Sequence, residues 1–321
     1  MKKRCLITGG AGFIGSHLAE ELVKRGHPVT IVDNFYKGKS KYHEELTGNI
    51  PIIPISILDK NSMHELVNQH DVVFHLAAIL GVKTTMEKSI ELIETNFDGT
   101  RNILQAALKG KKKVIFASTS EVYGKGTPPF SEEDDRLYGA TSKIRWSYAI
   151  CKTLEETLCL GYALQGLPVT IVRYFNIYGP RAKDGPYAGV IPRFIRAALQ
   201  GDDLLVYGDG KQTRCFTYVS DAVEATIAAM DEKVNGEIIN IGSEDEKSIQ
   251  EVAQDIHQLT HSSSKIVHVP FEKVYPHGFE EIPNRKPDVT KLKEMCQFHP
   301  NVSWEQGLKE TIQWFREIEN D

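Results

Sequence analysis

The chain has 321 residues, a formal net charge of −5, 41% hydrophobic residues and 25% charged residues. This length suffices for one large α/β unit or two domains, and the composition is that of an ordinary globular protein. The charge offers no basic field for nucleic acid or an anionic lipid surface, and no stretch approaches the roughly 18 apolar residues that a membrane span needs.

Short apolar runs alternate with helical patterns through the first 175 residues. The predicted strands are Cys5–Thr8, Val29–Val32, Ile50–Ile57, Val72–Leu76, Val114–Ala117 and Val169–Tyr174. Helical patterns lie between them near residues 13–24, 61–70, 89–109 and 141–165. Near-continuous apolar strands that alternate with helices favour a parallel sheet covered on both faces. The sequence therefore predicts an α/β fold with a doubly wound parallel (Rossmann) sheet.

The pattern after residue 175 is more mixed. Helices are predicted at Val190–Leu199, Ser220–Met230 and Ser248–Gln258, and a short strand at Ile238–Ile241. We predict that residues 1–175 form a dinucleotide-binding domain to which the chain returns near residues 217–242. Residues 176–321 are predicted to form mainly a smaller, mixed α/β region that covers the substrate.

The first predicted strand runs into a glycine-rich turn, Thr8-Gly9-Gly10-Ala11-Gly12-Phe13-Ile14-Gly15, inside which the first helix begins. Such glycines allow a tight turn and let backbone N–H groups and the helix N-terminus approach a pyrophosphate. Asp33 closes the second strand, where a carboxylate can bind a ribose 2′-hydroxyl and repel a 2′-phosphate. The turn and Asp33 together predict NAD as the cofactor.

The apolar strand at 114–117 stops at Ser118-Thr119-Ser120-Glu121, which is either a solvated strand end or a presentation of acid–base groups to a substrate. Farther along, Tyr148 and Lys152 stand four residues apart and so share one helix face. A cation beside a phenol favours the phenolate and lowers its pKa, which suits a base that takes a hydroxyl proton. This pair and the dinucleotide loop favour the acid–base interpretation.

Five cysteines are scattered along the chain without a C-x-x-C pair. An odd number with no paired spacing favours a reducing compartment and argues against a disulfide framework or a structural zinc site. We therefore expect a cytoplasmic protein without a metal.

Together these motifs resemble the extended short-chain dehydrogenase/reductase (NAD-dependent epimerase/dehydratase) family, whose members act on nucleotide-diphospho sugars. The resemblance runs from residue 1 to about 290 and is carried by TGGAGFIG (8–15), HLAA (75–78), Asn96, STSEVYG (118–124), YAICK (148–152) and RYFNIYGP (173–180). It implies that Tyr148 is the catalytic base, that Thr119 hydrogen-bonds the sugar O4 and that Lys152 binds the nicotinamide ribose. Asn176 and Arg214 match positions that contact the substrate diphosphate.

The resemblance also implies a wider set of cofactor-binding residues. They are Gly9, Gly12, Phe13, Ile14, Gly15, Asp33, Asn34, Ser56, Ile57, Leu76, Ala77, Ala78, Asn96, Tyr148 and Lys152. Ser56 departs from the family pattern, because many members have an aspartate there that contacts adenine. At this position adenine would rely on backbone groups.

Members of this family first oxidise C4 of the sugar and differ in how they use the ketone. 4,6-Dehydratases carry an Asp–Glu pair in the loop, and Ser120 replaces that aspartate here, so elimination of the 6-hydroxyl lacks its acid. Simple C4 epimerases usually have small or apolar residues where Ser120 and Glu121 stand. The Thr-Ser-Glu loop and the later Arg285-Lys286-Pro287-Asp288 resemble UDP-hexuronic acid decarboxylases best.

This resemblance implies that Arg285 faces the sugar carboxylate, while Ser120 and Glu121 assist decarboxylation and protonation of C5. A C4 ketone makes the C6 carboxylate a β-keto acid, which loses CO₂ readily. We therefore predict an NAD-dependent decarboxylase that converts UDP-glucuronate, or its 2-acetamido analogue, to a UDP-pentose. A UDP-sugar or UDP-uronate 4-epimerase is the alternative, and a non-catalytic NAD-binding sensor is disfavoured by the Tyr–Lys pair.

The helices predicted at 89–109 and 141–165 have two interpretations. They either pair with their copies in a second subunit, as is common in the family, or simply cover the sheet. We expect a homodimer that binds a UDP-sugar, with neither nucleic acid nor a membrane as a partner.

Overall fold

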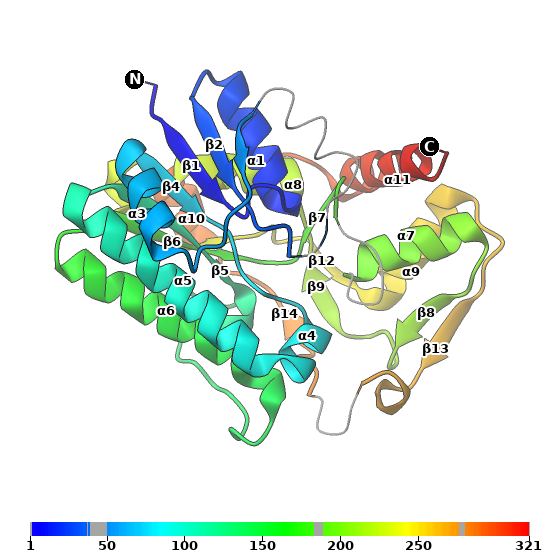
Figure 1. Ribbon diagram of the computed structural model, residues 1–321. Helices are drawn as coiled ribbons and strands as arrows, with labels where there is room; N and C mark the ends of the chain where they lie inside the picture. Colours follow the sequence, from blue (N-terminus) through cyan, green and yellow to red (C-terminus); the bar gives the residue numbers. More distant parts are fainter. Residues whose placement is uncertain (1, 37, 39–49, 183–188, 276–279, 321) are drawn as a thin grey trace.

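The computed structural model describes residues 2–36, 38, 50–182, 189–275 and 280–320. Within these residues the larger sheet has seven strands, all parallel, in the order β11-β6-β5-β4-β1-β2-β3 (Figure 1). The strands are β1 Cys5–Thr8, β2 Val29–Val32, β3 Ile52–Ile53, β4 Val72–His75, β5 Lys113–Thr119, β6 Val169–Tyr174 and β11 Ile238–Ile241. The predicted doubly wound α/β class is confirmed.

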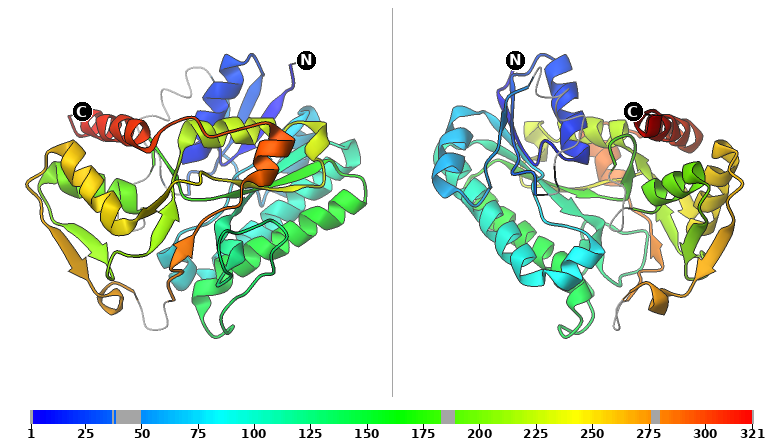
Figure 2. Two further views of the ribbon diagram at one scale, coloured as in Figure 1. Left: turned by 180° about the vertical axis from the view of Figure 1, so that it is seen from behind. Right: turned by 45° about the vertical axis from the view of Figure 1, so that its right-hand side comes forward.

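Helices cover both faces of this sheet. One face packs against α3 Lys60–Gln69, α5 Ser89–Gly110 and α6 Ser147–Leu164, and the other against α1 Phe13–Lys24, α8 Val219–Ala228 and α10 Thr290–Cys296 (Figures 1 and 2). Most residues of these strands are apolar because both faces of the sheet are buried.

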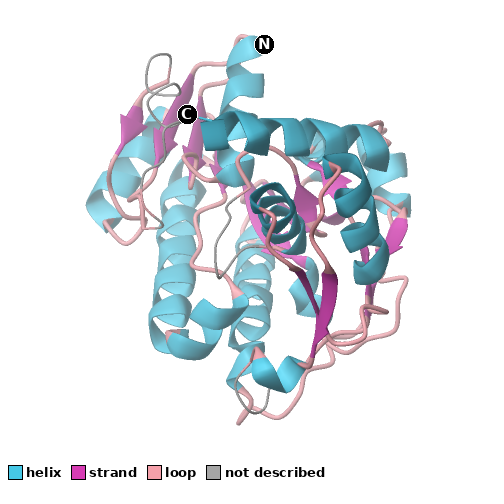
Figure 3. Cartoon of the chain, turned by 90° about the vertical axis from the view of Figure 1, so that its right-hand side faces the viewer, coloured by secondary structure: helices cyan, strands magenta, loops and turns pink. Residues whose placement is uncertain are grey.

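A smaller part of the chain lies beside the sheet, nearer the viewer in Figure 3. Its paired strands are β8 Leu204–Tyr207 with β13 Ile266–Val269, and β7 Ile177–Tyr178 with β10 Thr217–Tyr218. A third group has β9 Thr213–Cys215 between β12 Glu246–Ser248 and β14 Asn284–Arg285. Its helices are α7 Val190–Gln200, α9 Ile249–Thr260 and α11 Trp304–Asn320, while the short α4 Val82–Glu87 follows β4.

The strand order predicts a ligand site at the carboxyl ends of the strands. After β1 the chain builds outward through β2 and β3, and it then returns to the other side of β1 with β4, β5 and β6. In open α/β sheets of this kind, ligands bind outside the carboxyl ends of the strands, at the point where the order reverses. The loops that follow β1, β4, β5 and β6 all start at these carboxyl ends.

Two predicted elements differ from the structure, and one observed helix was not predicted. The third strand is only Ile52–Ile53, because Pro51 and Pro54 flank it and cannot donate ladder hydrogen bonds. The helix expected at 141–165 begins at Ser147, so the prediction is wrong for 141–146, which include a 3₁₀ turn at Ile144–Trp146. The helix α11 follows no pattern that was predicted from the sequence.

The strand β11 falls within the predicted return near residues 217–242 and is an edge strand of the larger sheet. The division of the chain at residue 175 stays a prediction. No helix in the described part of the chain is long and apolar enough to cross a membrane.

Candidate active site

The polar run at the end of β5 turns away from the sheet as a 3₁₀ helix, η1 Ser120–Tyr123. Thr119 caps it, since its hydroxyl accepts a hydrogen bond from the Glu121 backbone N–H at 3.2 Å. The turn ends at Gly124, whose φ is +61° and where a Cβ atom would lie 2.2 Å from the Leu137 carbonyl oxygen. Only glycine fits there, so the local sequence fixes where the Thr119–Glu121 side chains point.

Glu121 lies between two arginines that come from distant parts of the chain. Its carboxylate is 2.8 Å from Arg145 Nη2 and 2.5 Å from Arg285 Nη1, and the side chains of these arginines are only 4% and 9% exposed. Burial by itself would raise the pKa of Glu121, but the charges of Arg285 and Arg145 outweigh it and lower the pKa to about 2. The Glu121 carboxylate is therefore shared by two buried guanidinium groups.

Tyr148 stands in the first turn of α6, next to this cluster. Its side chain forms a hydrogen bond with Thr119, and the charge of Glu121 reaches it as well. Burial is the main cause that raises the pKa of Tyr148, followed by the charges of Glu155 and Glu121. Tyr148 is therefore a neutral phenol at neutral pH.

Lys152 lies one turn farther along α6, as predicted from its spacing. Its ammonium donates to the Ala117 carbonyl oxygen at 3.1 Å, lies 4.4 Å from the centre of the Phe116 ring, and pairs with Glu155 at 3.4 Å. The expectation that Lys152 lowers the pKa of Tyr148 is not met, because burial of the phenol, followed by the charges of Glu155 and Glu121, raises this pKa.

Two further predicted residues, Arg214 and Arg285, are neighbours in register on the parallel strands β9 and β14. Arg214 pairs with Glu281 at 2.6 Å, and burial together with the charge of Arg285 lowers the pKa of Arg214 to about 10. Asn176, after β6, donates to the Cys215 carbonyl oxygen at 3.5 Å. Strand pairing thus brings Arg214 and Arg285, which are 71 positions apart in the sequence, next to each other. They lie on one side of the active-site loop, which is formed by residues 119–122.

Asn176 and Arg214 also line a cleft of about 350 Å³ between α7 and the small sheets. Its wall includes Arg193, whose guanidinium lies 3.8 Å from the centre of the Tyr207 ring, and Tyr275 packs edge-on against the same ring. An arginine-stacked aromatic beside an amide and a second arginine forms a site that suits a flat ring joined to an anionic group.

The glycine-rich loop after β1 packs tightly against the loop after β4. Gly9 has φ +70°, and a Cβ atom there would lie 2.7 Å from the Ala77 backbone nitrogen. Gly12 is the N-cap of α1 and provides no side-chain cap, so N–H groups at the start of this helix remain available. Asp33 accepts hydrogen bonds from the backbone N–H groups of Ala11 at 3.1 Å and Phe35 at 2.8 Å, which fixes its carboxylate beside this loop.

The other predicted cofactor residues surround this loop. Leu76, Ala77 and Ala78 follow β4, and Phe13, Ile14 and Gly15 form the start of α1. Asn34 caps the turn after β2 through the Tyr36 N–H, and Ser56 accepts a hydrogen bond from the Leu58 N–H. Ile57 is buried against Gly99 of α5.

Asn96, the remaining predicted cofactor residue, lies beneath the loop that follows β4. Its amide is buried and bonds both the N–H and the carbonyl of Ile79, at 2.7 and 2.9 Å. Asn96 therefore holds the end of the loop that follows β4, and it supports that loop through Ile79.

Residues 5–242 match the NAD dependent epimerase/dehydratase family. The chain belongs to this family. It is 37% identical to the UDP-glucuronic acid decarboxylase 1 of Xenopus tropicalis over 98% of this chain and 72% of that protein. Among solved structures, the UDP-glucose 4-epimerase of Thermotoga maritima with UDP-glucose aligns with a TM-score of 0.89 and 32% identity, over 98% of this chain and 99% of that one.

The UDP-glucuronic acid 4-epimerase of Bacillus cereus, solved with UDP-glucuronic acid and NAD, also aligns, with a TM-score of 0.85 and 31% identity over 98% of this chain and 99% of that one. As a member of the family, this chain is an NAD-dependent enzyme. Its residues fit the cofactor, since an uncapped helix N-terminus faces the place of the pyrophosphate and the Asp33 carboxylate lies beside the glycine loop. The described residues contain no group of three or more His, Cys, Asp or Glu side chains placed to hold a metal ion.

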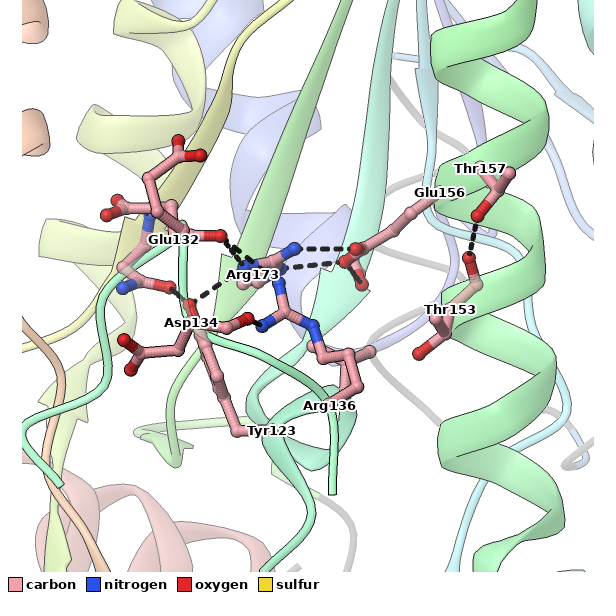
Figure 4. Close-up of polar contacts among 12 residues, drawn as sticks. Tyr123, Glu132, Asp134, Arg136, Thr153, Glu156, Thr157 and Arg173 are labelled. Carbon is pink, nitrogen blue, oxygen red and sulfur yellow. Dashed lines mark hydrogen bonds and ion pairs between the residues drawn. The ribbon is translucent and has the colours of Figure 1, made fainter. Parts of the chain in front are cut away.

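Sequence reasoning missed four residues that support this family site. Arg145 and Glu281 pair with predicted residues, and only the folded chain brings them together. Glu156 on α6 binds Arg173 of β6 through two hydrogen bonds, of 2.9 and 2.7 Å (Figure 4). Two of them had a signal in the sequence, since Arg145 stands close before Tyr148 and Arg173 begins the RYFNIYGP motif.

The Glu156–Arg173 pair anchors both ends of the active-site loop. Ser118 donates to Glu156 at 2.5 Å on one side of the loop, and Arg173 donates to the Tyr123 hydroxyl at 2.9 Å on the other. Figure 4 shows Arg173 between Glu156 and the segment that carries Glu132. Residues 119–122 are thus held between two fixed points.

Proposed function

We propose that this enzyme is an NAD-dependent decarboxylase of a UDP-hexuronic acid, either UDP-glucuronate or its 2-acetamido analogue. The observation that carries the proposal is the cluster of Glu121, Arg145 and Arg285 beside Thr119 and Tyr148. Two buried arginines next to the reacting hydroxyl favour a substrate that brings a carboxylate of its own. The similarity to UDP-glucuronic acid decarboxylases supports the same substrate class.

The reaction begins with oxidation at C4. Thr119 hydrogen-bonds the sugar O4, and Tyr148, as phenolate, takes the O4 proton. NAD, when bound, accepts the hydride from C4. Lys152 leaves Glu155 in part to bind the nicotinamide ribose and to favour the phenolate of Tyr148. The product of this step is a 4-keto hexuronate.

The ketone then allows CO₂ to leave. Arg285 holds the C6 carboxylate, the C5–C6 bond breaks, and the electron pair passes through C5 onto the C4 oxygen as an enolate. Glu121 orders this end of the site, and C5 takes a proton from water through the Ser120 hydroxyl, which completes the step. Because the Glu121 carboxylate is already shared between Arg145 and Arg285, substrate binding requires Arg285 to exchange part of that contact for the substrate carboxylate.

The nucleotide end of the substrate fits the cleft next to Arg214. We propose that the uracil lies near Tyr207 and Arg193 and that Asn176 and Arg214 contact the diphosphate. The proposed cofactor contacts are the glycine loop, Asp33 and the residues that follow β4.

We further propose that the enzyme is a cytoplasmic homodimer. The outer surfaces of α5 and α6 expose Ile90, Ile93, Ile150 and Leu154, whose exposed fractions range from 38% to 72%. Large apolar side chains gathered on one helical face favour burial against a second copy. All five cysteines are free, which suits a reducing compartment.

Incubation of the enzyme with NAD and UDP-glucuronate, or with UDP-2-acetamido-glucuronate, tests the proposal. We expect release of CO₂ and a product whose mass is lower by that of CO₂ if the ketone is reduced again. A product lower by the masses of CO₂ and H₂ identifies release of the 4-keto pentose. A product of unchanged mass with a new sugar resonance would replace the proposal with a UDP-uronate 4-epimerase, the activity of the similar Bacillus cereus enzyme.

The variant Tyr148→Phe tests the assignment of the base. It should lose oxidation of C4, measured as the absorbance of NADH in a single turnover, while still binding NAD with near-native affinity. Oxidation at a substantial rate in this variant would show that another group takes the O4 proton.

A further inference from the structure

Glu155 is a buried carboxylate that pairs with the lysine of the Tyr–Lys couple. Both of its oxygens lie 3.4 Å from Lys152 Nζ, and the side chains of Lys152 and Glu155 are only 3% and 1% exposed. Nothing in the motif that places Tyr148 and Lys152 on one helix face requires an acid at this position. A carboxylate taken out of water beside a catalytic cation has a strong effect on that cation.

A chain of buried hydrogen bonds ends on the same carboxylate. The Thr100 hydroxyl donates to Glu155 Oε1 at 2.5 Å, and His75 Nε2 lies 3.0 Å from the Thr100 oxygen. Because Thr100 gives its proton to Glu155, the ring nitrogen that faces it has to be the donor. His75 Nδ1 is then the acceptor of the Thr8 hydroxyl, 2.7 Å away. Burial lowers the pKa of His75 to about 3, so the ring is neutral and has one proton to donate.

These bonds make Glu155 the acceptor at the end of the chain. Thr8, His75 and Thr100 each donate toward it, and the Cys151 thiol donates to its other oxygen at 3.8 Å. At its far end the chain reaches the cofactor loop, since the Ala77 backbone N–H lies 3.4 Å from the Thr8 hydroxyl oxygen. A line of side chains therefore connects the cofactor loop with Lys152.

The titratable and polar groups around Tyr148 and Lys152 come from four elements. They are Glu121 from η1, His75 from β4, Cys151, Lys152, Glu155 and Cys159 from α6, with the Thr119 hydroxyl from β5. Of these, Glu155 and Glu121 are the carboxylates whose charges raise the pKa of Tyr148. Glu121 is already paired with two arginines, whereas Glu155 has only Lys152 as a cationic partner among the described contacts.

We propose that Glu155 is a positioning residue that holds Lys152 and keeps Tyr148 in its phenol form, and thereby sets the pH range in which C4 is oxidised. This inference rests on the proposed role of Tyr148 as the base. Glu155 touches neither substrate nor cofactor and acts through Lys152. The chain from Thr8 to Glu155 fixes the position of the carboxylate beside Lys152, so that the lysine charge becomes available to Tyr148 only when the lysine turns toward the nicotinamide ribose.

The variant Glu155→Gln tests the proposal through a pH profile. Removing one negative charge within the cluster makes loss of the Tyr148 proton easier, so the acid limb of kcat/KM for C4 oxidation should move to lower pH by about one unit or more. A second readout is ultraviolet difference titration of the phenolate in the holoenzyme, with Tyr148→Phe as the blank. The Tyr148 titration should move in the same direction and by a similar amount.

Two variants make the result specific. Glu155→Asp keeps the carboxylate, but the side chain is shorter by one methylene and the charge lies farther from Lys152. The pH profile of kcat/KM for this variant should therefore lie between those of the wild type and Glu155→Gln. Glu155→Asp also serves if the glutamine variant fails to fold, because a profile that matches the wild type would then overturn the proposal. Glu65→Gln removes an exposed carboxylate of α3 and should leave the profile unchanged.

The outcomes separate this inference from the proposed function. If Tyr148→Phe is inactive while Glu155→Gln keeps the wild-type pH profile and phenolate titration, the role of Glu155 is wrong and the base assignment stands. If Tyr148→Phe still oxidises C4, the base assignment itself fails. A purely structural role for Glu155 would lower the denaturation midpoint and leave both pH readouts in place.

Discussion

Glu121 shows how a single side chain gains its ionisation state from two partners. The sequence places it at the end of a strand, where it could as well be a solvated turn residue. In the folded chain it is nearly buried, and Arg285 and Arg145 outweigh the effect of burial, so that its pKa falls from 4.5 to about 2. The same contacts tie η1 to the segment before α6 and to β14.

This shift predicts how stability depends on pH. A carboxyl group whose pKa is lower in the folded chain than in the unfolded chain stabilises the fold above the unfolded pKa, and that contribution is lost as the pH falls through the folded pKa. For Glu121 the contribution should be complete above about pH 5 and should disappear between about pH 4.5 and 2, with a size of about 3 kcal/mol.

Urea unfolding of the wild type and of Glu121→Gln at pH 7 and at pH 3 measures this. The difference in the free energy of unfolding between the two proteins should be larger at pH 7 than at pH 3. Glu65→Gln, which alters an exposed carboxylate, is the control and should show no such dependence. An equal difference at both pH values would mean that the two arginines do not hold Glu121 in its ionised form.

At the scale of elements, β6 and α6 are joined beneath the active-site loop by Arg173 and Glu156, whose side chains are only 1% and 5% exposed. Removing one partner of a buried pair leaves the other charge without compensation, so Glu156→Gln should lower the free energy of unfolding by about 3–5 kcal/mol. Urea unfolding at pH 7 measures the change. The variant should also weaken C4 oxidation, because Ser118 loses its charged anchor at one end of the loop.

An exposed pair provides the matched comparison. Glu305 and Lys309 stand four residues apart on α11, with side chains 69% and 58% exposed. Glu305→Gln should cost about 0.5 kcal/mol or less, because solvent screens such pairs. Similar costs for Glu156→Gln and Glu305→Gln would show that the Arg173 charge finds solvent or another partner when the carboxylate is removed.

The elements also show how far sequence reasoning reaches. Apolar runs predicted β1, β2 and β6 with their observed bounds, because a strand buried on both faces leaves a continuous hydrophobic signal. The signal failed for β3, where prolines interrupt the run. It also failed for α11, whose buried residues are spaced among many charged ones.

The site divides in the same way. Local spacing placed Tyr148 and Lys152 on one helix face, and the end of β5 located Thr119. Spacing along a helix cannot show what packs against its far side, so the pairing of Lys152 with Glu155 and the opposite effect on the pKa of Tyr148 stayed hidden. The register of β9 with β14, which brings Arg285 next to Arg214, depends on pairing across 71 positions and leaves no local trace.

At the scale of the whole molecule, the outer faces of α5 and α6 expose several large apolar side chains. The two helices pack side by side on the sheet, and Ile90, Ile93, Ile150 and Leu154 point outward with exposed fractions of 72%, 40%, 38% and 50%. Ile150 and Leu154 are four residues apart, so they lie on one stripe of α6. Pairing of this face with its copy would bury that stripe and form a closed, two-fold interface.

The double variant Ile150→Glu with Leu154→Glu should therefore be a monomer. Two carboxylates on each subunit would face their copies across the two-fold axis, and burying them without partners costs more than the apolar contact gains. Sedimentation equilibrium should give the mass of two chains for the wild type and of one for the variant. Val23→Glu, at a 38% exposed position of α1 on the opposite face of the sheet, should remain dimeric. If the wild type has the mass of one chain, α5 and α6 only cover the sheet and form no subunit interface. If the double variant is still a dimer, the interface lies on another surface.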